Sequence, residues 1–257
     1  MTTEARYLYA IGRNLRAEDL RAAQGINQQP LEVVRHRGLD AVVSTVSLDE
    51  FGEEPLKANL EQLAWLESVA RAHDEVVALV ARSGAVAPLR LATICLDDDG
   101  VRARLDEWFF PLQQVLDRVQ GRLEWSVKTF APPAADSSTA PDTVPAGGPG
   151  AGAAYLQRRR EATVRRQQAE GSALAAADEV YRELSTVAVA GRRLPAQDPR
   201  LSGHRGTMTL NAAFLVGEGE TADFEDAVRR LQARFPEAEI ATSGPWPPYS
   251  FAMLEQR

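Results

Sequence analysis

Residues 208–235 read MTLNAAFLVGEGETADFEDAVRRLQARF and combine two periodicities in one short segment. In the first half, one face of the chain is apolar at every second residue: Met208, Leu210, Ala212, Phe214 and Val216. This period predicts a β-strand with a buried face. The second half repeats apolar residues at spacings of four, three and four, as an amphipathic helix does: Phe224, Val228, Leu231 and Phe235. Because another β-prone run follows at 239–242, the segment predicts a strand, a helix and a closing strand.

The sequence before this segment predicts a long helix from about residue 155 to residue 184. Its first half is polar and basic, and its second half is amphipathic. A short strand is expected at 186–190. We therefore assign 155–257 to a C-terminal α+β domain, which ends in a proline- and aromatic-rich tail at 244–257.

Residues 131–154 read APPAADSSTAPDTVPAGGPGAGAA and contain no basic and no aromatic residue. Such a segment cannot bury enough apolar surface to offset the entropy of ordering it. We expect a flexible Ala/Pro/Gly linker. Two interpretations remain open, because the segment can be a linker between two domains or a long surface insertion inside one domain.

Residues 1–130 predict an N-terminal α+β domain. Strands are expected at 7–11, 33–34, 41–46, 86–94 and 125–130, and helical patterns at 56–80 and 101–119. Pro111 is expected to kink or interrupt the second helix. The order of these elements contains the alternation of a ferredoxin-like split βαβ sheet with helices packed on one face. The predicted fold class is thus α+β, with two domains.

The charge and the cysteine count exclude several classes of function. The chain carries 29 basic and 36 acidic residues, a net charge of −7, whereas nucleic-acid-binding domains usually show a strongly basic surface. A single cysteine, Cys95, excludes an internal disulfide and a cysteine-based zinc cluster. The three histidines lie far apart, and no phosphate-binding glycine motif occurs. We expect no nucleic-acid partner, no metal and no cofactor.

The sequence also indicates the compartment. No run approaches the roughly 18 apolar residues of a transmembrane helix. The N-terminus, MTTEAR, leads directly into a strand-like segment, without a basic stretch followed by an apolar one. We therefore expect a cytoplasmic protein without a membrane span.

Three chemically suggestive groups have a structural interpretation that we favour. His73, Asp74 and Glu75 are adjacent on a predicted helix and point about 100° apart, so they do not share one site, and we expect His73 to be packed in the core. The acidic run at 97–99 lacks the spacing of a calcium loop and suits a helix N-terminus. Cys95 has apolar neighbours, which predicts a buried thiol.

Two segments are candidates for binding a partner protein. Arg158, Arg159 and Arg160 form either a solvated helix face or a docking surface for an acidic patch, on the first domain or on a partner. Trp246, Tyr249 and Phe251 lie in GPWPPYSF, whose prolines stiffen the backbone and exclude a central strand. Their rings either fill a groove between or beside the domains, or anchor another protein. No catalytic residue is predicted.

Several segments, in the same order along the chain, resemble the GvpF/GvpL family of gas vesicle proteins. The most specific of them are Glu124-Trp125-Ser126-Val127-Lys128 and the closing GPWPPYSF, and the others include Leu210–Val216, Ala154-Tyr155-Leu156 and Pro88-Leu89-Arg90. The resemblance covers nearly the whole chain apart from 131–154.

The resemblance implies a non-enzymatic accessory protein, located at the gas vesicle and in the cytoplasm. Such a protein would support assembly of the vesicle shell by binding the main structural shell protein and other accessory Gvp proteins. It also implies two α+β domains, of which the second is ferredoxin-like. The alternative hypothesis is a small-molecule-binding or enzymatic ferredoxin-like protein, because fold alone does not determine function.

Overall fold

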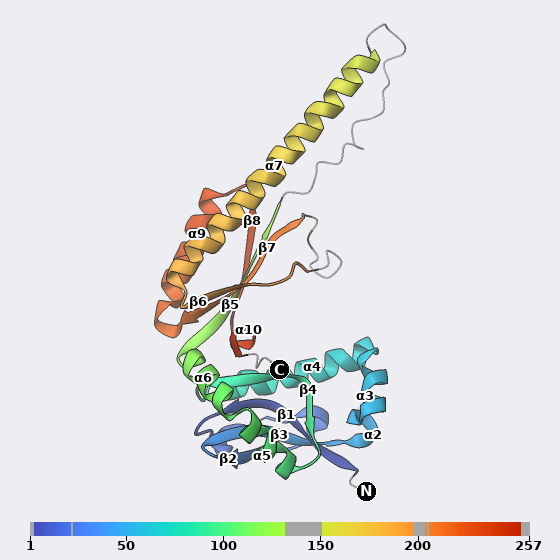
Figure 1. Cartoon of the computed structure of the whole chain (residues 1–257), viewed down its shortest axis with the longest axis vertical. Coiled ribbons are helices and arrows are strands. Elements are labelled where there is room, and N and C mark those ends of the chain that lie inside the picture. Colours follow the sequence, from blue (N-terminus) through green and yellow to red (C-terminus); the bar gives the residue numbers. More distant parts are fainter. Residues whose placement is uncertain (1–2, 22, 132–150, 198–203, 205, 253–257) are drawn as a thin grey trace. The chain divides into compact units, whose positions relative to one another are not determined.

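The computed structural model describes residues 3–21, 23–131, 151–197, 204 and 206–252 (Figure 1). These residues form two compact units. The first unit takes the chain up to Glu124 together with the residues from Pro245 onward, and the second unit runs from Trp125 to Gly244. The chain therefore leaves the first unit once and returns to it at its C-terminal end.

The first unit contains a four-stranded sheet in the order β2-β3-β1-β4. Its elements are β1 (Glu4–Gly12), α1 (Ala17–Leu20), a short 3-10 turn (Ile26–Gln28), β2 (Glu32–His36), β3 (Leu39–Ser47), α2 (Leu48–Phe51), α3 (Glu53–Leu60), α4 (Leu63–Ala81), β4 (Val86–Cys95), α5 (Asp98–Glu107), α6 (Phe109–Val119) and the C-terminal α10 (Tyr249–Ala252). Strand β1 pairs antiparallel with both β3 and β4. Because helices α2 to α4 connect β3 to β4 across β1, this half of the unit is a split βαβ motif.

Helices cover both faces of the first sheet, whereas the sequence predicted helices on one face. Six consecutive residues of β1, Tyr7–Gly12, are buried, and so are six of β3, Leu39–Ser44. Since successive side chains of a strand point to opposite faces, a continuous buried run needs cover on both sides. Helix α4 contacts β1 and β4, while α5 contacts β2, β3 and β4.

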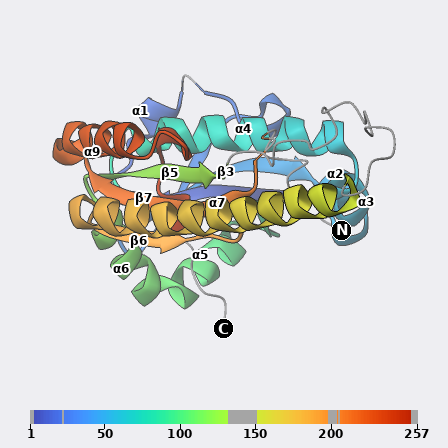
Figure 2. The ribbon, with the colours of Figure 1, turned by 90° about the horizontal axis from the view of Figure 1, so that it is seen from above.

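The second unit is a βαββαβ sheet in the order β6-β7-β5-β8. Its elements are β5 (Arg122–Phe130), α7 (Ala151–Val187), β6 (Ala190–Arg193), β7 (Met208–Gly217), a 3-10 turn (Glu218–Glu220), α9 (Thr221–Arg234) and β8 (Glu239–Trp246). Read from β8, the strands follow the ferredoxin-like order of fourth, first, third and second. Helices α7 and α9 run side by side against this sheet (Figures 1 and 2). The segment at 208–235 therefore forms the strand and helix predicted from its periodicities.

The predicted domains were 1–130 and 155–257. The observed second unit has different boundaries from the predicted one, at both its N-terminal and its C-terminal end. The strand at 125–130 is the first strand of the second sheet, because its apolar face packs in the core of that unit through Trp125 and Val127. The predicted linker, 131–154, follows this strand and overlaps the start of α7 at Ala151, so the segment connects two elements of the same unit and ends earlier than predicted. Its residues 132–150 lie outside the described part of the chain.

Two predicted elements, one helix and one strand, need correction. The predicted helix at 56–80 is broken into α3 and α4, because Gln62 has an extended backbone, and Leu63 at the break is 77% exposed. The predicted strand at 186–190 is largely absent, because 186–187 end α7, 188–189 form a bend and the strand begins only at Ala190. By contrast, the helix around Pro111 is interrupted at Trp108, and Pro111 occupies the first turn of α6, where its missing N–H is tolerated. None of the described helices is both long and apolar enough to cross a membrane.

Candidate functional site

The C-terminal segment after β8 packs on the first unit, and its three predicted aromatic residues have different environments. Phe251 is only 8% exposed, while Trp246 at the end of β8 is 52% exposed. Tyr249 is half-buried and packs against the core of the first unit. Helix α10 contacts β4 and α6. The structure therefore separates one exposed ring from two rings that hold the segment in place.

Two carboxylates of the first unit fix this segment. The Tyr249 hydroxyl donates to Asp74 Oδ1 over 2.8 Å. Ser250 donates twice to Glu124, from its backbone N–H over 2.7 Å and from its hydroxyl over 2.6 Å. Burial and the bond to Asp74 raise the pKa of Tyr249, so this hydroxyl remains a donor at physiological pH.

The sequence analysis did not identify the acceptors Asp74 and Glu124 as parts of a site. Asp74 belongs to the cluster at 73–75, whose members point apart as expected: His73 is buried, while Asp74 and Glu75 are exposed. Glu124 is 8% exposed although it is charged. Its signal in the sequence is an acidic residue directly before the apolar positions of β5, but only the folded chain shows which donor it accepts.

The other candidate residues, Arg158, Arg159 and Arg160, lie in the N-terminal half of α7. Arg160 is exposed, and the side chains of Arg158 and Arg159 lie outside the described part of the structure. Neither segment places a described nucleophile, acid or base in a shared cavity.

The C-terminal half of α7 is the part that packs on the second sheet. Its buried residues recur at spacings of three and four: Ala173, Ala176, Ala177, Val180 and Leu184. Gly171 stands two residues before Ala173, in the helix interior, and a side chain added there meets no atom within 4 Å.

Replacing this glycine should stabilise the second unit. We expect Gly171→Ala to raise the free energy of unfolding by about 0.5–1 kcal/mol, because alanine loses less backbone entropy in a helix. Chemical denaturation followed by circular dichroism measures the change. Gly206→Ala is the matched control and should destabilise, since its Cβ would collide with the Ala131 carbonyl oxygen. Equal effects of the two changes would contradict this account.

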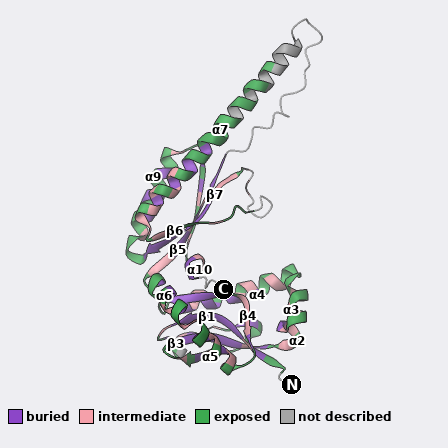
Figure 3. Ribbon diagram, in the orientation of Figure 1, coloured by how far each residue is buried: buried purple, intermediate pink, exposed green. Residues whose placement is uncertain are grey.

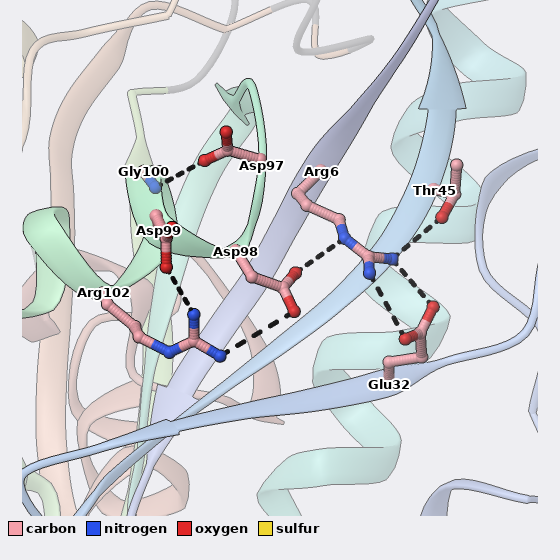
Figure 4. A network of polar contacts seen from close by, with 8 residues as sticks. All are labelled: Arg6, Glu32, Thr45, Asp97, Asp98, Asp99, Gly100 and Arg102. Carbon is pink, nitrogen blue, oxygen red and sulfur yellow. Dashed lines mark hydrogen bonds and ion pairs between the residues drawn. The ribbon is translucent and has the colours of Figure 1, made fainter. Parts of the chain in front are cut away.

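A polar network joins the sheet of the first unit to the start of α5 (Figure 4). Arg6 on β1 contacts Asp98, Glu32 on β2 and Thr45 on β3, each at 2.8 Å. Arg102 pairs with Asp99 at 2.7 Å. Arg6, Thr45, Asp98, Asp99 and Arg102 line a depression of about 410 Å³, in which both arginines are paired with carboxylates. The network fastens three strands to one helix, and we assign it a structural role.

The acidic run and the cysteine beside this network have the structural roles expected from the sequence. Asp97 caps α5, because its carboxylate accepts the backbone N–H of Gly100 over 2.8 Å. Burial raises the pKa of the Cys95 thiol, which is 8% exposed, so it is poorly suited to act as a nucleophile. Among the described residues, no cluster of three or more His, Cys, Asp and Glu side chains could hold a metal ion.

A buried polar cluster lies between β1 and α4. The Tyr7 hydroxyl accepts the backbone N–H of Ala92 and lies 3.0 Å from His73 Nδ1. The Tyr9 hydroxyl lies 2.7 Å from Ser44 Oγ and accepts the backbone N–H of Ile26. Burial raises the pKa of both tyrosines and lowers that of His73. The two hydroxyls and His73 Nδ1 are hydrogen-bonded, His73 Nε2 is buried without a partner among the described residues, and we assign these neutral groups a structural role in the core.

The depressed pKa of His73 predicts that acid destabilises the first unit. The folded state binds this proton less readily than the unfolded state, whose histidine titrates near 6.5. The contribution of His73 is therefore complete above that pH and is lost as pH falls through the lower pKa of the folded state. Urea unfolding at a series of pH values should show this loss, and His73→Gln should reduce it. An identical pH dependence in both proteins would refute the assignment.

Comparison with known proteins gives a consistent result over the whole chain. Residues 5–253 match the family model described as gas vesicle synthesis protein GvpL/GvpF. Gas vesicle protein L of Streptomyces sp. (strain CB03234) is 38% identical over 255 residues, which cover 99% of this chain and 95% of the relative. Gas vesicle protein F of the same strain is 28% identical over 251 residues, covering 95% and 98%.

Solved structures show the same fold. The crystal structure of the gas vesicle protein GvpF from Anabaena sp. PCC7120 superposes with a TM-score of 0.68 at 20% identity, and 98% of each chain is covered. That of GvpF from Microcystis aeruginosa gives a TM-score of 0.66 at 19% identity, covering 97% of this chain and 99% of the other. Both domains of the present chain are therefore found together in these proteins.

Proposed function

The chain belongs to the gas vesicle synthesis protein GvpL/GvpF family, and on this premise we propose that it supports assembly of the vesicle shell by binding the main structural shell protein and other Gvp proteins. In this proposal it acts without catalysis, in the cytoplasm and at the gas vesicle. The observation that carries the proposal is the family match over residues 5–253.

The exposed ring of Trp246 supports a role in protein contact. Tryptophan is enriched among the residues that dominate binding energy at protein interfaces. Here the prolines at 247 and 248 and the bonds of Tyr249 and Ser250 hold the backbone beside it. We propose Trp246 as a partner-binding residue, with Tyr249 and Phe251 as the residues that position it.

The arginines at 158–160 are the second proposed contact surface. Arg160 is exposed on α7, and this part of the helix has no described buried side chain. A protein that acts through surface contacts needs such accessible groups, whereas an enzyme needs convergent groups in a pocket.

Two measurements in vesicle-forming cells test the proposed function. Deletion of the gene should abolish or reduce vesicle formation, and the full chain supplied in trans should restore it. Affinity capture of the tagged chain should recover the main shell protein. The Trp246→Ala variant, which should fold normally, is expected to recover less of it than Arg71→Ala, a change on the exposed face of α4. Normal vesicles after deletion, or no recovery of shell protein, would refute the proposal.

A further inference from the structure

Two leucines at the junction of α3 and α4 are exposed on the first unit. Leu60 ends α3 and is 41% exposed. Leu63 begins α4 and is 77% exposed, the largest value among the large apolar side chains that the structure describes. Three peptide steps separate the two residues, so their Cα atoms lie within about 11 Å of each other. We call residues 48–67, which contain α2, α3 and the start of α4, the α2–α4 corner.

The leucines of this corner follow a helical period that normally marks a buried face. Leu56, Leu60, Leu63 and Leu66 recur at spacings of four, three and three, but only the first and the last of them are partly buried. Helix α3 contains no buried residue, and Figure 3 shows it in the colours of exposed and intermediate residues. Because a helix of eight residues is too short to be stable without tertiary contacts, its apolar side chains are expected to have a packing partner.

Hydrogen bonds and ring contacts hold the backbone of the corner in place. Trp65 Nε1 donates to Glu50 Oε1 over 2.6 Å, and the side-chain amide of Asn59 donates to the backbone carbonyl of Glu50 over 3.1 Å. The ring centroids of Phe51 and Trp65 lie 5.4 Å apart. The two exposed leucines therefore stand on a supported backbone, and a partner would bind them without the entropic cost of ordering the corner.

The charges around these leucines are mostly negative. Residues 48–67 carry six acidic side chains and one basic one, a formal charge of −5 in a chain whose net charge is −7. The basic side chain, Lys57, is already paired with Glu53 and Glu54, at 3.1 and 2.9 Å. Glu61 lies between the two leucines in the chain, is exposed, and forms no ion pair with any residue that the structure describes. The apolar pair is therefore accompanied by excess negative charge.

We propose that the α2–α4 corner docks a segment of a partner protein that is apolar on one side and carries basic residues beside it, with Leu60 and Leu63 as the apolar contacts and Glu61 as the main charged contact. The inference rests on the proposed function, because it assumes that the chain acts through protein contacts. It adds a surface on the first unit that differs from the C-terminal aromatic segment and from the arginines of α7. Burial of the leucines would supply affinity, while the opposite charges would set orientation and the rate of association.

Other occupants of the corner fit its charge less well. Anionic membrane surfaces and nucleic acids would be repelled by it. A second copy that paired through the same corner would bring two formal charges of −5 together in a symmetric contact. These occupants are outcomes that the experiment distinguishes.

Site-specific photo-cross-linking in vesicle-forming cells tests the proposal with the full chain. The cross-linking amino acid benzoylphenylalanine replaces Ala58 on α3 or Ala64 on α4, which are both exposed. Ala103, which is exposed on α5 of the same unit, is the positional control. Mass spectrometry identifies the cross-linked peptide. We expect cross-links from 58 and 64, but not from 103, to a protein segment with Lys or Arg beside its apolar residues.

Single substitutions make the result specific. Leu63→Ser should reduce the cross-link from position 58 about tenfold, because an apolar contact is lost. The matched control is Leu96→Ser, which changes a leucine of the same unit that is 66% exposed outside the corner, and it should have no effect.

Glu61→Lys should also reduce the cross-link about tenfold, since an attraction becomes a repulsion. Exchanging the partner's basic residues for Glu should restore it. Because the substituted side chains are exposed, the circular dichroism spectrum and the unfolding midpoint of each variant should match those of the unsubstituted chain.

Several outcomes would overturn the inference: cross-links to lipid, to nucleic acid or to a second copy, a partner segment without basic or without apolar residues, a yield that neither substitution changes, or no cross-link above that from position 103. Gene deletion judges the proposed function separately. If deletion abolishes vesicles while this cross-link is missing, only the present inference is wrong.

Discussion

The Phe251→Ala variant is expected to lower the free energy of unfolding of the first unit by about 3 kcal/mol. Truncation of a buried phenylalanine to alanine typically costs 3–5 kcal/mol, and we take the lower end because Phe251 keeps 8% exposure in a short helix. The loss should be accompanied by release of the C-terminal segment, because Phe251 lies next to the Ser250 bonds to Glu124. Chemical denaturation measures the first effect, and limited proteolysis near the C-terminus measures the second.

Trp246→Ala is the matched control in the same segment. Its ring is larger, yet it is 52% exposed, so we expect a loss of less than about 1 kcal/mol. Sequence alone left open whether Trp246 is a core residue or a partner anchor, and the difference between the two variants separates these roles. A large destabilisation by Trp246→Ala with little effect of Phe251→Ala would refute the assignment made here.

The second large loss of stability is expected from a substitution in the second unit. Phe214 on β7 is fully buried. Its ring centroid lies 5.6 Å from the ring centroids of both Phe224 and Tyr181. We expect Phe214→Ala to destabilise this unit by about 3–5 kcal/mol, because it leaves a cavity between the sheet and the two helices. Phe214→Leu, which fills part of that space, should cost about half as much.

Tryptophan fluorescence and circular dichroism can follow these variants. Trp125 belongs to the second core and its ring lies 5.8 Å from that of Phe224, so it should report on the unfolding of this unit. Arg229→Ala on the exposed face of α9 serves as the control and should change stability by less than about 0.5 kcal/mol. A Phe214→Ala protein as stable as this control would contradict the assignment of Phe214 to the core.

Much of the secondary structure followed from local periodicity. The strand at 208–216 and the helix at 224–235 were predictable because their large apolar residues recur at a fixed spacing. The interruption of the helix near Pro111 was also predictable from a local property, because proline lacks the backbone N–H that a helix interior needs. The break between α3 and α4 was not, because leucines continue at helical spacing through a residue whose backbone is extended.

The candidate site could be predicted only in part. The residue types that suit protein contact, three arginines and three aromatic side chains, were visible in the sequence. Their separation into the exposed Trp246 and the buried Phe251 was not, because both belong to one short aromatic segment without a clear period. Asp74 and Glu124 became part of the site only when the C-terminal segment packed beside them.

By itself, the sequence determined the fold class, most strands and helices and the family, since all of these depend on residue types and short spacings. The tertiary structure alone decided that β5 opens the second sheet and that the C-terminal residues return to the first unit. The physical reason is that a strand's periodicity specifies a buried face but not the neighbour with which it pairs. That choice depends on how well distant apolar faces fit together, which no local pattern contains.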